Sequence, residues 1–174
     1  MTIATADWYR FGHGSAHGAD AVRAKLSRLE SATTHVLHSV ELGPDERPLD
    51  YLVISPAGVF PVSVCDVHGT SIRITNYGLS VDGTGLPILR QAKFGAERVS
   101  RLLERALGVE VPARGCVVLL TDAHSPRIAW ESRPIGVSVL AKRNVARWLR
   151  GQPAVLTPDE VQSAYEAALQ LAAA

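Results

Sequence analysis

The sequence contains few of the residues on which several classes of protein depend. It has two cysteines in 174 residues, Cys65 and Cys116. Two thiols so far apart do not make the disulfide framework of a small secreted protein. No run of about 18 apolar residues occurs, so we expect no membrane-spanning helix. The first residues, MTIATADWYRFGHG, lack a basic segment followed by an apolar one, so we expect no signal peptide. These absences favour a reducing, cytoplasmic compartment.

The chain also lacks an excess of charge of either sign. Lys and Arg number 18 against 17 for Asp and Glu, which gives a formal net charge of +1. This balance provides no general attraction to nucleic acid, although a local basic patch remains compatible with it. What the sequence does have is apolar residues, at 47%, with 20% charged residues, as in a soluble globular protein. Its richness in alanine and its few lysines are compatible with a GC-rich bacterial source.

The hydrophobic pattern predicts a mixture of helices and strands in one domain. Helices are expected at residues 15–30, 87–108, 142–150 and from 157 to about 171. Strands are expected at residues 34–42, 49–55, 59–67, 71–76, 79–83, 115–121 and 135–140. This order of elements predicts an α/β fold with a mixed central β-sheet flanked by helices.

Local residues sharpen three of these expectations. The short PAG turn at 56–58 indicates an antiparallel hairpin between the strands on either side of it. Pro61 cannot donate to a ladder of hydrogen bonds, so it indicates a sheet edge, a bulge or a strand start. The segment TPDE at 157–160 has the pattern of a capping box at the start of the last helix.

Several segments resemble, in order and spacing, the nuclease-related domain (NERD), a branch of the PD-(D/E)XK nuclease superfamily. They are GAD (18–20), LDYLVISPAGVF (49–60), SVCDVHG (63–69), ILRQA (88–92) and AVLTPDEVQSAYEAAL (154–169). The most specific part is the block 49–69. The resemblance implies a single domain over residues 1–174. Within it we expect an N-terminal arm (1–15), a core like that of restriction endonucleases (16–140) and C-terminal helices (141–174).

The resemblance also implies positions for a catalytic site. In such nucleases carboxylates hold a divalent metal ion, and the metal and a lysine stabilise charge on the scissile phosphate. Carried over residue by residue, the helix glutamate of the family falls on Ala19 and the strand aspartate on Asp50. The acid and the lysine of the next strand fall on Ser63 and Cys65, and the helix glutamine falls on Gln91. Asp50 and Gln91 are retained, and the other three polar residues are lost.

These losses predict a weak metal site or none. Mg²⁺ takes oxygen ligands, and Asp50 alone supplies one carboxylate. Asp66 follows Cys65 on a strand, so its side chain is expected on the opposite face. Asp20 follows Ala19 on a helix, about 100° around the axis, and remains a candidate for a displaced acid. We therefore expect no cofactor, and Mg²⁺ or Mn²⁺ only if the displaced acid rebuilds a site.

Three functions remain open at this point. The first is a catalytically degraded nuclease-like domain that binds nucleic acid or a protein partner. For nucleic acid, the candidate contacts are cations in the segment KRNVARWLR, namely Lys142, Arg143, Arg147 and Arg150. The second is a divergent metal-dependent DNA nuclease that retains activity through Asp50 and Gln91. The third is a structural interaction module that forms homo-oligomers. The sequence leaves the oligomeric state and the partner open.

Overall fold

The computed structural model describes residues 16–42, 48–121 and 126–173. The predicted N-terminal arm, residues 1–15, lies outside these ranges. The elements are, in chain order, α1 (Ala16–Ser27), β1 (His35–Val40), β2 (Leu49–Ser55), β3 (Gly58–Val67), β4 (Ser71–Ile74), β5 (Leu79–Val81), β6 (Thr84–Leu86), α2 (Ile88–Leu107), β7 (Gly115–Thr121), β8 (Arg127–Trp130), β9 (Val137–Ala141), α3 (Val145–Arg150) and α4 (Pro158–Ala172).

The central sheet has the strand order β1-β2-β3-β7-β9 in the described part of the chain. β1, β2 and β3 pair antiparallel, whereas β3, β7 and β9 pair parallel. The predicted hairpin across residues 56–58 is confirmed, with Ser55 opposite Gly58. The predicted mixed sheet in an α/β fold is therefore confirmed as well.

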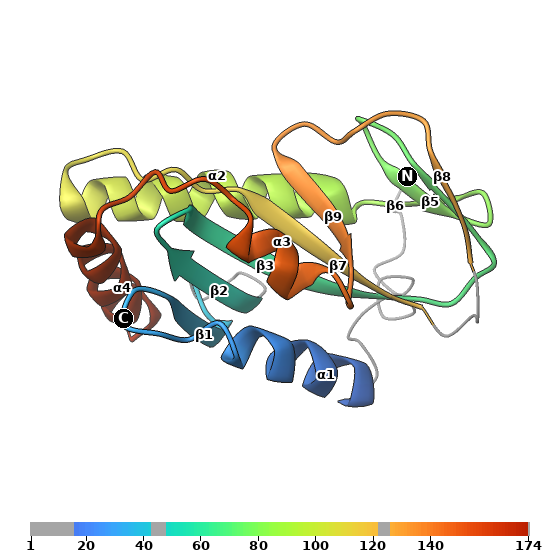
Figure 1. Cartoon of the computed structure of the whole chain (residues 1–174). Helices are drawn as coiled ribbons and strands as arrows, with labels where there is room; N and C mark the ends of the chain where they lie inside the picture. Colours follow the sequence, from blue (N-terminus) through green and yellow to red (C-terminus); the bar gives the residue numbers. More distant parts are fainter. Residues whose placement is uncertain (1–15, 43–47, 122–125, 174) are drawn as a thin grey trace.

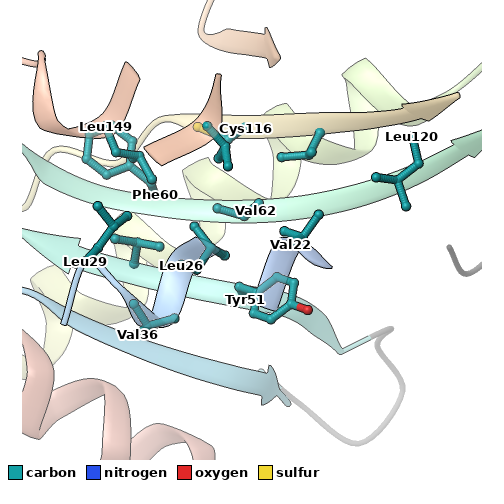
Figure 2. Close-up of a cluster of buried hydrophobic side chains, with 13 residues drawn as sticks. Val22, Leu26, Leu29, Val36, Tyr51, Phe60, Val62, Cys116, Leu120 and Leu149 are labelled. Carbon is teal, nitrogen blue, oxygen red and sulfur yellow. The ribbon is translucent and has the colours of Figure 1, made fainter. Parts of the chain in front are cut away.

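Helices cover both faces of this sheet (Figure 1). On one face, Val22 and Leu26 of α1 and Leu149 of α3 pack onto side chains of β2, β3 and β7, in the cluster that Figure 2 shows. On the other face, α2 and α4 pack onto the same strands, with Val99 and Val161 among the buried contacts. Strands buried on both faces explain the nearly continuous apolar runs in β2, β3 and β7.

A second, smaller sheet has the order β6-β5-β4-β8 and lies beside the start of α2 (Figure 1). The second sheet differs from the single sheet expected from the sequence, and its strands β6 and β8 were not predicted. The sequence of β8, RIAW, has three successive apolar residues and no alternation that would have revealed a strand, and all four residues are exposed.

Two further expectations were wrong. Pro61 lies inside β3, a central strand, opposite Leu52. It is tolerated because amide donors alternate along a strand: the N–H of Val59 points to Pro112, and Pro61 faces the same side. Pro61 therefore removes no hydrogen bond to β2. On its other side it interrupts the parallel pairing with β7, which forms a bridge at Val59–Ala113 and resumes at Val62.

The second wrong expectation is the start of α3, which was predicted at residue 142. Lys142, Arg143 and Asn144 form a turn, and the helix starts at Val145.

In the described residues, no helix is both long enough and apolar enough to cross a membrane.

Candidate functional site

Asp50 lies at the start of β2, where the pairing of β2 with β3 ends. Its half-buried carboxylate accepts a hydrogen bond from the backbone N–H of Val64, with 2.7 Å between Oδ2 and the nitrogen. The register of the two strands reaches Tyr51 opposite Val62. Beyond this pair, the next amide of β3 that points towards β2 is that of Val64. The Asp50 carboxylate accepts its hydrogen bond in place of a backbone carbonyl. A hydrogen bond assisted by the charge of the carboxylate fixes the position of this oxygen.

Ser63 and Cys65 share one face of β3, because residues two apart in a strand point the same way. Continuing the register by one residue places Asp50 opposite Ser63, which is half-buried. Cys65 is 2% exposed and packs in the apolar cluster under α2 that includes Leu89. The structure thus brings Asp50 and Ser63 together, and it encloses a thiol at the position where the resemblance places a lysine.

Gln91 is an exposed residue in the first turn of α2. It shares a helical stripe with Gly95, four residues later. A Cβ on Gly95 would lie 3.6 Å from a methyl group of Leu49, the residue before Asp50. The stripe that carries Gln91 therefore faces the start of β2. Ala19 lies within α1, on the other face of the sheet.

Tyr51, the residue after Asp50, packs against α1, and it was not identified from the sequence. Its side chain is 7% exposed and packs in the cluster beneath α1 (Figure 2). Burial raises the pKa of the Tyr51 hydroxyl. The carboxylates of Asp50 and Asp20 add to this rise in pKa, and the guanidinium of Arg23 opposes it. α1 therefore brings an acid and a cation to the end of the sheet where Asp50 lies.

A divalent metal ion of the magnesium type does not fit these residues. One oxygen of Asp50 is engaged by the Val64 amide. Ser63 offers a neutral hydroxyl, and Cys65 offers a buried thiol, a ligand that suits softer metals. Across residues 16–42, 48–121 and 126–173, no group of three or more His, Cys, Asp or Glu side chains is placed to hold a metal ion.

The predicted nucleic-acid contacts lie elsewhere, where α3 packs beside α1. The Nη2 atom of Arg150 lies 3.5 Å from the carbonyl oxygen of Arg28, which places the end of α3 against the end of α1. Residues 16–30 and 142–150 together contain seven Lys and Arg residues and two Asp and Glu residues. We define the basic surface as these seven cations, Arg23, Lys25, Arg28, Lys142, Arg143, Arg147 and Arg150, of which all but the half-buried Lys25 are exposed.

Comparison with known proteins identifies the family. A model of the nuclease-related domain, NERD, matches residues 14–120, which is more than half of the chain. The chain belongs to the NERD family. The match includes the five positions from Ala19 to Gln91 discussed above, whereas β8, β9, α3 and α4 lie beyond it. The NERD assignment confirms the expected resemblance.

Other comparisons add little to this assignment. No curated protein matches the chain. Among solved structures, the chain is similar to SfsA of Pyrococcus furiosus in complex with Ca²⁺, at 14% identity and a TM-score of 0.27. The match covers 87% of this chain and 49% of that one, so the chain spans about half the length of SfsA. A likeness at this level supports no conclusion about the site.

Proposed function

We propose that this NERD domain binds double-stranded nucleic acid through its basic surface and does not cleave it by a metal-dependent mechanism. The observation that carries the binding proposal is the packing of α1 beside α3. It joins two cationic segments that are more than 100 residues apart in the sequence. The positive charge is local, because the chain as a whole carries +1. Exposed cations gathered from two neighbouring segments suit the spaced phosphates of a duplex.

The absence of cleavage is proposed from the residues at the family positions. An alanine, a serine and a buried cysteine replace two acids and a lysine. Removing one group that stabilises developing charge commonly lowers a rate by about 10²–10³. Groups that act together do not contribute additively, so the losses cannot simply be multiplied. They do remove two of the three carboxylates that would hold a metal ion, and also the cationic partner of the phosphate.

One observation favours the alternative of a divergent nuclease. Asp20 lies close enough to the Tyr51 hydroxyl to raise its pKa, as Asp50 does. Asp20, Asp50 and Gln91 could then act with Mg²⁺ or Mn²⁺ bound. We propose the non-catalytic function instead, since two carboxylates, one of them bonded to the Val64 amide, leave most positions around a divalent ion without a protein ligand. We also propose a reducing, cytoplasmic compartment, in which both cysteines would remain free thiols.

The proposed binding is tested by titrating a short fluorescent DNA duplex with the protein at several salt concentrations. We expect the logarithm of affinity to fall linearly with the logarithm of salt concentration, by about 0.9 for each phosphate neutralised. The double variant Arg147→Ala/Arg150→Ala should reduce this slope by about one to two units. The matched control is Arg101→Ala/Arg105→Ala, which removes two exposed cations from α2 on the opposite face. Binding that does not depend on salt, or an equal loss in both variants, would contradict the proposal.

A further inference from the structure

A pocket of ≈ 570 Å³ lies at the β9 edge of the central sheet, away from Asp50. Its wall is formed by β9 and by side chains from three other parts of the chain. Arg114 comes from the residue before β7, Trp130 from the end of β8, Arg133 from the link between β8 and β9, and Trp148 from α3. Because its wall combines separate parts of the chain, the pocket forms only when the chain folds. It cannot be recognised in any single segment of the sequence.

The pocket carries positive charge without a matching acid. Two arginines, Arg114 and Arg133, line it, and none of the described residues in its wall is acidic. Glu131, the acid closest in sequence to Arg133, pairs instead with Arg73, at 3.1 Å between Nε and Oε1. An arginine pair of this kind suits a phosphate, because each guanidinium can donate two parallel hydrogen bonds to phosphate oxygens.

The pocket also presents two indole rings. Trp130 is 53% exposed, although its backbone is fixed by pairing with Ile74 of β4. Trp148 is half-buried and is held by an edge-to-face contact with Phe60, with 5.7 Å between ring centroids and 82° between planes. An indole that remains exposed on a fixed strand offers its face to a flat ligand. Aromatic faces beside cations are the usual surface on which nucleobases stack.

The edge of the sheet adds polar groups to the wall. β9 is the last strand on this side of the central sheet among the described residues, so its outer edge has no paired neighbour there. Backbone groups on such an edge remain able to form hydrogen bonds. The hydroxyl group of Ser138, which also lines the pocket, can both donate and accept.

We propose that this pocket binds a nucleotide, with the base against Trp130 and Trp148 and the phosphate held by Arg114 and Arg133. The volume falls within the range of about 300–1,000 Å³ that is common for small-ligand sites. A base next to a phosphate group is present both in a free nucleotide and at the phosphorylated end of a single strand. The pocket shares α3 with the basic surface but includes none of its seven cations, so this inference does not rest on the proposed binding of duplex DNA.

Isothermal titration calorimetry of the full chain tests the pocket with four probes. They are adenosine monophosphate, adenosine, inorganic phosphate and a 5′-phosphorylated oligothymidylate. The expected result is that the nucleotide or the phosphorylated oligomer binds at least tenfold more tightly than adenosine or phosphate alone, because both halves of the pocket contribute. Tighter binding of the oligomer identifies a strand end as the ligand, and tighter binding of the monophosphate identifies a free nucleotide.

Paired variants link that binding to the pocket. Trp130→Ala and Arg133→Ala should each weaken binding about tenfold or more. The matched controls, Tyr77→Ala and Arg101→Ala, remove an aromatic ring that is 89% exposed and a cation of α2, and both should bind as the unmodified chain does. All four positions are exposed, so thermal unfolding should show intact folds.

The proposal is overturned if none of the phosphorylated probes binds, or if the pocket variants bind as tightly as their controls. Its failure is distinguishable from failure of the proposed function. Duplex binding that is sensitive to Arg147→Ala/Arg150→Ala, without nucleotide binding, overturns the pocket alone. Nucleotide binding without duplex binding supports the pocket and contradicts the proposed function.

Discussion

Asp50 retains the charge of a metal-binding aspartate but forms a structural hydrogen bond in this chain. Its carboxylate accepts from the Val64 amide, at the point where β2 stops pairing with β3. The sequence shows that an aspartate begins the strand. It cannot show which amide of β3 is left without a strand partner, because that depends on the register. The same limit applies to Tyr51, whose proximity to Asp20 depends on the packing of α1.

Asp82 is a second carboxylate with a structural role, in the tight turn between β5 and β6. Asp82 and Gly83 have φ values of 47° and 84°, as a two-residue hairpin of the Asp-Gly kind requires. The carboxylate accepts hydrogen bonds from the backbone N–H groups of Ser71, at 2.8 Å, and of Thr70. These two bonds hold the pKa of Asp82 below its usual value of 3.8.

The lowered pKa of Asp82 predicts a specific loss of stability in acid. Between its folded and unfolded pKa values the unfolded chain binds more protons, so the stabilisation present above pH 3.8 declines as the pH falls further. Asp82→Asn keeps a residue that tolerates a positive φ but removes the charge. We expect the variant to be less stable at pH 7, with the difference shrinking towards pH 3, in urea unfolding at each pH. A difference that stays constant over this range would contradict the role of the charge.

At the scale of elements, α2 carries Gln91, and its close approach to β7 fixes the position of the helix. A Cβ on Gly115 would lie 2.6 Å from the carbonyl oxygen of Ala92, so a side chain there would push α2 away from the sheet. The limits of α2 were largely predictable, since Pro87 and Gly108 flank it, and Gly108 adopts a φ of 73°. The close packing of α2 on β7 was not predictable, because it depends on how two distant segments meet.

Replacing Gly115 by alanine should therefore destabilise the protein, by about 1–3 kcal/mol as expected for overpacking against a rigid backbone. Gly85→Ala is the matched control, because nothing lies within 4 Å of its added Cβ. The free energies of unfolding should be measured in urea for both variants and for the unmodified chain. Equal values for the two variants would show that α2 adjusts freely above β7.

At the scale of the whole molecule, the sequence predicted the frame better than the surfaces. The central strands, the hairpin and the family resemblance follow from local patterns in residues 49–69 and 87–121. The packing of α1 beside α3 and the pocket at β9 follow from contacts between distant segments, which no local sequence pattern predicts. The β8 strand was missed for the same reason, since it is held by β4 rather than by its own apolar residues.

We propose that this NERD domain binds DNA but has lost the groups needed to cut it. The most direct measurement incubates the purified chain with supercoiled plasmid and Mg²⁺ or Mn²⁺, with Asp50→Ala as a parallel sample, and follows both plasmid forms and complex formation. We predict that the plasmid is bound and stays intact in both samples. Cleavage by the unmodified chain that is abolished by Asp50→Ala would contradict the account.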